Sequence, residues 1–165
     1  MPFQPNPRRA IMKKIFTACL ILLVSLSSAP GSSAREDRGL SKGQMVYVPA
    51  YSHIYSGNIE LPSLLAVTLS IRNTDLDHPI EILVVDYYET QGKLVKRYIS
   101  SPIKLNALGT KRYIIPEKDK TGGSGANFIV EWKAERPVNL PLIETIMIGP
   151  RSSFTSRGQA IFPSK

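Results

Sequence analysis

The residues IEILVVDYY, numbered 80–88, are apolar on both sides of an extended chain and rich in β-branched and aromatic side chains. This composition predicts a central strand, because both faces of such a strand are buried. A turn at Gln91-Gly92 and a second strand-like segment, LVKRYIS (94–100), follow at once. The sequence therefore predicts a β-hairpin at the centre of the fold.

Strand patterns continue on both sides of this hairpin. Residues 65–72 alternate between aliphatic and small or polar side chains and end at the turn cluster Asn73-Thr74-Asp75. Three later segments also have strand character: KRYII (111–115), FIVEWKAE (128–135) and LIETIMI (142–148). In the second of these, the alternation places Trp132 in the core.

The fold class follows from the recurrence of short strands with turn signals between them. No segment after residue 34 shows an amphipathic helical period with caps. About seven antiparallel strands within about 110 residues are typical of an all-β protein with two packed sheets. We therefore expect a single immunoglobulin-like β-sandwich domain over residues 44–158, with a C-terminal tail at 159–165.

The first thirty-four residues have the composition of a secretory signal. Basic residues precede an apolar run at 15–26, and Ser32-Ser33-Ala34 resembles a cleavage site. The run is shorter than the ~20 apolar residues that a spanning helix needs, so a retained anchor is the weaker interpretation. We expect cleavage after residue 34, a linker at 35–43 and a periplasmic or secreted protein. Met12 is an alternative start.

Removal of this signal changes the chemistry available to the chain. Cys19 is the only cysteine and lies inside the apolar run, whereas a lipid-modified cysteine follows such a run. The mature chain is then free of disulfide and thiol chemistry. Loss of the four basic residues of the signal lowers the count of Lys and Arg from 21 to 17 against 13 Asp and Glu, so the net charge falls from +8 to +4.

The sequence MVYVPAYSHIY (45–55) is the first candidate binding surface. Tyr51, His53 and Tyr55 share one parity with Tyr47, while Val46, Val48 and Ile54 share the other. If the aliphatic side faces the core, the aromatic side faces outward and could stack on sugars or dock a partner. The alternative is that Pro49 breaks the parity and leaves the tyrosines half-buried.

The glycine-rich loop TGGSGANF (121–128) is the second candidate, with Ser124 and Asn127 as its polar side chains. It lacks the lysine of a phosphate-binding loop and the third glycine of a dinucleotide fingerprint, and a strand follows it instead of a helix. Its backbone N–H groups could still form a small anion-binding nest. A connecting loop with positive φ angles is the favoured interpretation.

A few charged side chains complete the inventory. Arg157, in SFTSRG (153–158), could contact an anion or pin the C-terminal segment to the fold. The spacing of carboxylates in NTDLDHP (73–79) only partly resembles a calcium loop, since the glycine and the terminal glutamate of such loops are missing. We expect no bound metal and no cofactor. A rival hypothesis is a metal-dependent binder or hydrolase that uses His53 or His78 with Asp75, Asp77 or Asp86.

The order of motifs resembles an uncharacterised bacterial family, domain of unknown function 3124. The resemblance rests on the following segments: GQMVYVPAYSHIY (43–55), TLSIRNTD (68–75), VDYYETQGKLVKRYI (85–99), GGSGANFIVEWKAE (122–135), MIG (147–149) and FTSRG (154–158). It implies a small exported bacterial protein, and no activity comes with it.

Together these observations predict a non-catalytic binding or scaffolding module of the bacterial envelope. The expected partner is an envelope protein or a glycan, and nucleic acid is not expected for an exported chain. Membrane contact is expected only through the signal segment.

Overall fold

The computed structural model describes residues 39–55 and 61–162. The expected signal segment lies outside the described residues, as do the first part of the expected linker and residues 163–165. The described residues form strands, loops and turns without a helix. Accordingly, none of them belongs to a helix long and apolar enough to cross a membrane.

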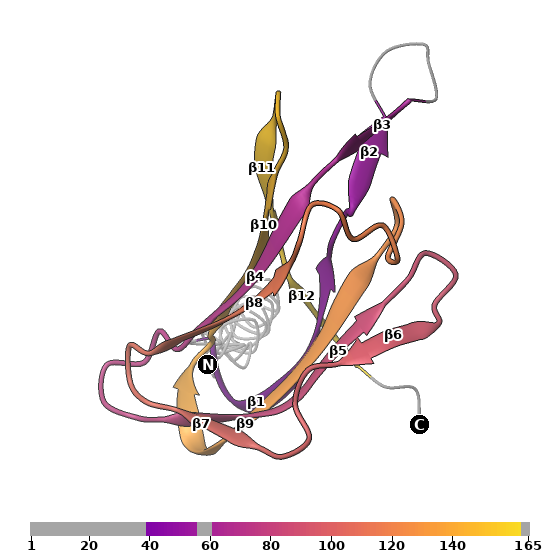
Figure 1. Cartoon of the computed structure of the whole chain (residues 1–165). Coiled ribbons are helices and arrows are strands. Elements are labelled where there is room, and N and C mark those ends of the chain that lie inside the picture. The colour runs from indigo at the N-terminus through magenta and orange to yellow at the C-terminus, as the bar shows by residue number, and fades with distance from the viewer. Residues whose placement is uncertain (1–38, 56–60, 163–165) are drawn as a thin grey trace, which may run out of the picture. The chain divides into compact units, whose positions relative to one another are not determined.

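The described residues form twelve strands (Figure 1). In chain order these are β1 (Leu40–Pro49), β2 (His53–Tyr55), β3 (Pro62–Leu64), β4 (Ala66–Arg72), β5 (Ile80–Tyr88), β6 (Leu94–Arg97), β7 (Ile103–Leu105), β8 (Thr110–Ile115), β9 (Asn127–Asn139), β10 (Leu142–Ile148), β11 (Ser153–Arg157) and β12 (Gln159–Ile161). The sequence predicted about seven, because strands of three residues such as β2, β3 and β12 are too short to show an alternating pattern.

All strand pairs are antiparallel, as expected. One sheet has six strands in the order β12-β1-β9-β5-β6, with β7 also paired to β5. A second sheet has the order β11-β10-β4-β8, and β2 and β3 form a separate two-stranded ribbon. The hydrophobic segment 80–88 is thus an interior strand, and its hairpin partner is β6.

The buried core lies between the six-stranded and the four-stranded sheet (Figure 1). Its largest fully buried side chains are Trp132, Tyr87, Phe128, Leu65, Leu69, Ile71, Ile80, Ile82, Ile115, Met147, Val48 and Val67. Trp132 is 1% exposed, in agreement with the alternation of its strand. Thr145 joins the sheets directly, because its hydroxyl donates a 2.6 Å hydrogen bond to the carbonyl of Pro49.

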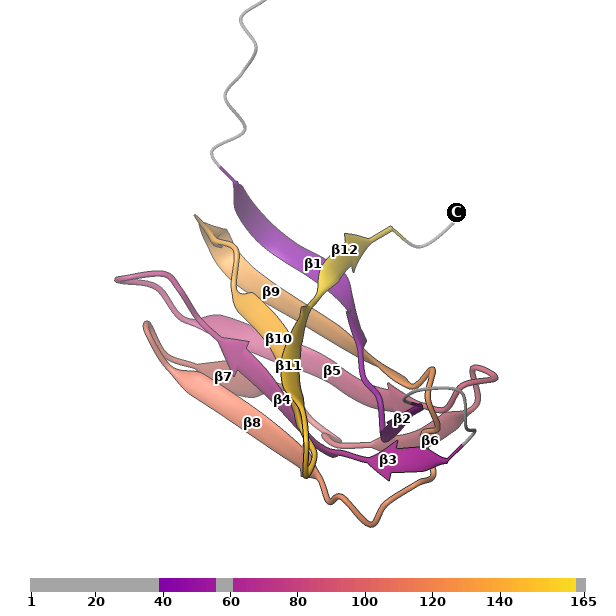
Figure 2. The ribbon, with the colours of Figure 1, turned by 90° about the horizontal axis from the view of Figure 1, so that it is seen from above.

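Both domain boundaries differ from the expected ones. β1 begins at Leu40, inside the expected linker, and pairs with β9 through a bulge between Ser41 and Gly43. β12 lies inside the expected tail and pairs with β1. The chain reaches it by crossing from one sheet to the other at Gly158, as Figure 2 shows. A Cβ at Gly158 would lie 2.6 Å from Val46 Cγ1, so only glycine fits this crossing.

Asp75 organises the turn cluster that follows β4. Its carboxylate accepts hydrogen bonds from the backbone N–H groups of Asp77 (3.1 Å), His78 (2.9 Å) and Asn139 (3.1 Å). It also lies 3.0 Å from Nδ1 of His78. The side chain is buried, and these bonds connect the β4–β5 turn to the end of β9. Asp75 is therefore a structural hub whose carboxylate oxygens serve the backbone of two turns.

Asn73 extends this hub to the β7–β8 turn. Its Nδ2 lies 3.3 Å from the carbonyl oxygen of Leu105 and 3.0 Å from that of Asn106. The hydroxyl of Thr74 donates to the carbonyl of Leu140 at 2.7 Å. Three turns at one end of the fold are thereby held to one another by the side chains of residues 73–75.

The hub predicts an acid-dependent stability. Hydrogen bonds from the backbone of Asn139 and Asp77, with those of His78, hold the pKa of Asp75 far below its usual range. Because the pKa is lower in the folded state, the ionised carboxylate stabilises the fold above pH ~4 and loses this effect as the pH falls below it. We expect Asp75→Asn to be less stable than the wild type at pH 7, by a difference that narrows at pH 3. Urea unfolding at both pH values checks this, and an equal difference at both would contradict it.

Candidate functional site

The aromatic segment keeps its alternation through Pro49. Val46, Val48, Ala50 and Ser52 are all buried, and Ile54 packs against the core. The residues of the other parity are less buried: Tyr47 and Tyr55 are exposed, Tyr55 to 54%, whereas Pro49, Tyr51 and His53 are half-buried. However, pairing with β9 ends at Pro49, and the chain leaves the six-stranded sheet to form β2. The outward residues therefore lie on two elements and do not form one continuous strand face.

The predicted residues Tyr51, His53 and Tyr55 have different surroundings. The ring of Tyr51 packs against Phe154 of β11 with centroids 6.0 Å apart and contacts the core. The rings of His53 and Tyr55 meet edge to face with centroids 5.4 Å apart. His53 Nε2 and the Tyr55 hydroxyl are within 3.3 Å. The structure thus brings His53 and Tyr55 together on one face of the ribbon and places Tyr51 behind them against the fold.

The glycine loop docks against this same segment. The backbone N–H and the hydroxyl of Ser52 both donate to the carbonyl of Gly123, at 3.0 and 3.1 Å. The N–H of Ala50 donates to the carbonyl of Ala126 at 2.8 Å. Two motifs that are about seventy residues apart in the sequence therefore form one structural unit. We call β2, β3 and the loop 121–126 the aromatic end of the molecule.

Packing, and not ligand geometry, explains the glycines of this loop. Gly123 has a φ of +78°, and a Cβ at Gly122 would lie 1.8 Å from the hydroxyl of Tyr87. The carbonyl of Gly122 accepts hydrogen bonds from the N–H and the hydroxyl of Thr90, and that hydroxyl accepts one from Gly125. The loop thus closes over the end of β5, which agrees with the interpretation as a connecting loop.

Ser124 and Asn127 lie within and directly after this loop, and both are half-buried. Asn127 pairs with Pro49 and Tyr88 at the end of the six-stranded sheet. Arg157 is elsewhere: it lies exposed on β11, opposite Glu144 of β10. Three of the six predicted binding residues, His53, Tyr55 and Ser124, therefore belong to the aromatic end. Tyr51 and Asn127 directly adjoin it in the chain, and Arg157 belongs to a different surface.

Comparison with known proteins agrees with this set of motifs. A family model described as "Protein of unknown function (DUF3124)" matches residues 43–161. The chain belongs to this family. No curated protein and no solved structure matches it. The matched region includes the whole aromatic end and every buried core residue.

The histidines and carboxylates of the rival hypothesis are dispersed in this DUF3124 chain. Asp86 is buried and forms a two-pronged ion pair with Arg97, with both N–O distances at 3.0 Å. This pair raises the pKa of the Arg97 guanidinium. His78 contacts Asp75, whose oxygens are occupied by backbone N–H groups, and His53 contacts Tyr55. Within residues 39–55 and 61–162, no three His, Cys, Asp or Glu side chains are placed to share a metal ion.

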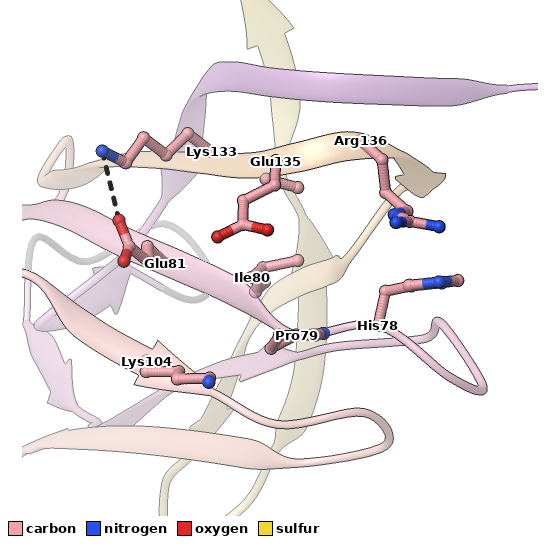
Figure 3. Close-up of a pocket in the computed structure, with 9 residues that line it drawn as sticks. His78, Pro79, Ile80, Glu81, Lys104, Lys133, Glu135 and Arg136 are labelled. Atoms are coloured by element: carbon pink, nitrogen blue, oxygen red, sulfur yellow. Dashed lines mark ion pairs between the residues drawn. The ribbon is translucent and has the colours of Figure 1, made fainter.

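A pocket of about 310 Å³ lies at another place, on the six-stranded sheet near the Asp75 hub. Figure 3 shows Glu81 and Lys133 at one end, His78 and Arg136 at the other, and Ile80 between them. Lys133 Nζ and Glu81 Oε2 form a 3.2 Å ion pair that is largely exposed and so contributes little stability. The pocket is lined by acidic and basic side chains together with the apolar residues Pro79, Ile80 and Ala134. This lining suits a small polar or zwitterionic group.

This pocket could not be predicted from the sequence, because the neighbours of its charged residues depend on strand register. Glu81 of β5 pairs with Lys104 of β7 on one side and with Lys133 of β9 on the other. The only signal in the sequence was the charged side of each alternating strand, which is typical of any solvated sheet face. Which charged residues become neighbours depends on pairing between segments far apart in the chain.

Proposed function

We propose that this protein is an exported, non-catalytic binding or scaffolding module of the bacterial envelope, and that it docks its partner through the aromatic end. One observation carries the proposal. The His53 and Tyr55 rings form an edge-to-face pair on a two-stranded ribbon that hydrogen bonds hold to the glycine loop, and Tyr55 remains 54% exposed.

The physical argument concerns preorganisation. An exposed aromatic side chain supplies a large contact area with a polar tip, and it loses little conformational entropy on binding if it is already held in place. His53 is held between the Ser52 hydroxyl, 3.4 Å from Nδ1, and the Tyr55 hydroxyl. Tyr51 and Phe154 support the base of the ribbon from behind. This arrangement suits an envelope protein or a glycan, both of which pair well with aromatic platforms.

Two further features belong to the same proposal. The N-terminal basic residues, the apolar run at 15–26 and Ser32-Ser33-Ala34 support export to the periplasm or beyond. Two antiparallel sheets with a shared core support an immunoglobulin-like sandwich, an architecture that many binding modules of cell surfaces share. Fold alone does not define function, so the aromatic end carries the argument.

The experiment is capture of envelope components on immobilised protein. We expect His53→Ala/Tyr55→Ala to reduce retention of the specific partner by about 30-fold or more, since two central contacts each contribute roughly 1–2 kcal/mol. Tyr47→Ala is the matched control, because Tyr47 is an exposed tyrosine on the same N-terminal segment but on β1. Equal retention by the double variant and the control would sink the site assignment. Treatment of the captured material with protease or with a glycosidase separates a protein partner from a glycan.

A further inference from the structure

The outer face of the four-stranded sheet carries a row of polar residues with an arginine at each end, which strand pairing brings together. Arg157 of β11 pairs with Glu144 of β10, Glu144 with Ser70 of β4, and Ser70 with Arg112 of β8. These four positions have the strand parity opposite to that of the core residues Leu69, Ile71, Ile143 and Thr145, and so lie on the outer face; Ser70 is nevertheless buried there, at 4% exposure. The row crosses the whole sheet.

A third arginine stands beside this row. Arg72 lies two positions after Ser70 on the same face, and its Nε donates to the Ser70 hydroxyl at 3.1 Å. The Nε lies 3.9 Å from Glu144 Oε1. Within the described part of the chain, this is the only ion pair on the face, so Glu144 offsets one of three positive charges. Arg112 and Arg157 are exposed.

The adjacent part of the same face carries no charged side chain and contains three isoleucines among small and hydroxyl residues. The next row pairs Thr155 of β11 with Ile146, Ile146 with Thr68, and Thr68 with Ile114 of β8. Ile114 and Ile148 are each 55% exposed, although alternating strands normally place polar residues there. The face is therefore divided along the strands into an arginine part and an isoleucine part.

From this division we infer a binding site for an anionic phospholipid surface on the outer face of the four-stranded sheet. Guanidinium groups recognise phosphate oxygens in a planar, two-pronged manner, and exposed aliphatic side chains enter the boundary between headgroups and acyl chains. The net charge of the face has the sign needed to attract anionic lipids. This site is independent of the aromatic end and adds a membrane contact to the one expected through the signal segment.

The test is co-sedimentation of the chain from residue 35 onward with lipid vesicles. Every core residue lies between Val46 and Met147, so this form contains the complete core, and a cooperative thermal melt checks its folding first. Omitting the N-terminal apolar run removes the other source of lipid affinity. We expect binding to vesicles of phosphatidylcholine with about 30% phosphatidylglycerol, little binding to phosphatidylcholine alone, and weakening by salt.

Two sets of variants locate the site. Arg112→Gln/Arg157→Gln should weaken binding about 25-fold, at about fivefold for each arginine. Lys93→Gln/Lys104→Gln removes the same charge from the six-stranded sheet, where Lys104 lies on β7 and Lys93 directly precedes β6, and should keep most of the binding. Ile114→Ser/Ile148→Ser should lower the binding that persists at high salt.

Three results would overturn the inference. The first is equal loss in the arginine and lysine variants, which would mean that only net charge matters. The second is the absence of binding to the anionic vesicles. The third is binding to a soluble polyglutamate peptide without binding to vesicles, which would assign the arginines to an acidic protein partner instead of a lipid surface.

Discussion

Replacing Trp132 by alanine is expected to lower the free energy of unfolding by about 3–5 kcal/mol, the largest effect of any substitution discussed for this protein. The side chain is 1% exposed and lies at the centre of β9, between β1 and β5. Its partners across the sheet are Gln44 and Ile82. The loss combines the transfer of a large aromatic group with the cavity left in a closely packed interior.

Urea unfolding followed by circular dichroism measures this change, because the substitution removes the only tryptophan and with it a fluorescence signal. Trp132→Phe provides the matched control and should cost less, since most of the volume remains. It also removes the indole N–H, which is buried and has no hydrogen-bond partner among the described residues. A loss below about 1 kcal/mol for Trp132→Ala would show that the core is not packed around this residue.

Replacing Gly122 by alanine is the second large effect. The new Cβ would lie 1.8 Å from the hydroxyl oxygen of Tyr87 and 2.6 Å from its Cζ, and Tyr87 is itself 1% exposed. Neither the loop nor β5 can move away without breaking the hydrogen bonds of Thr90 to the Gly122 carbonyl. We expect a loss of about 1–3 kcal/mol, as for other overpacked interiors.

A double-mutant cycle makes this prediction specific. Tyr87→Phe removes the hydroxyl that the new Cβ meets, and that hydroxyl has no hydrogen-bond partner in the described structure. Tyr87→Phe alone should leave the free energy of unfolding nearly unchanged. In the Gly122→Ala background, Tyr87→Phe should restore part of the lost stability. Gly122 has no positive φ, so the expected cost there is steric. Gly92→Ala gives the size of a backbone effect without a clash for comparison, because Gly92 has a φ of +83° with open space around it. Strictly additive effects of the two changes at positions 87 and 122 would contradict the contact.

The strands that alternate over seven or more residues could be predicted from the sequence. β4 and β9 were found in this way, and the buried position of Trp132 follows from period two. The short strands could not be found, because three residues such as Gln159–Ile161 contain no period. The sheet change at Gly158 depends on its distance from Val46, which lies more than a hundred residues earlier in the chain.

The candidate site could be predicted only in its local part. His53 and Tyr55 alternate with aliphatic residues along the segment 45–55. This alternation is visible in the sequence, and it predicts that both side chains face outward. The docking of Ser52 on Gly123 is a contact between segments far apart in the chain, and no spacing rule predicts it. For the same reason Arg157 could be singled out alone, whereas its row with Arg112, and Arg72 beside that row, required the pairing of four strands.

Site-specific photo-crosslinking in living cells tests the central claim, docking through the aromatic end, most directly. A photoreactive residue at position 55 samples the exposed tip of the ring pair, and one at Lys118 samples an exposed site in the β8–β9 connection as a control. The proposal predicts one defined envelope species trapped from position 55 and none from position 118. The same species trapped equally from both positions, or no species from an abundant and folded protein, would contradict it.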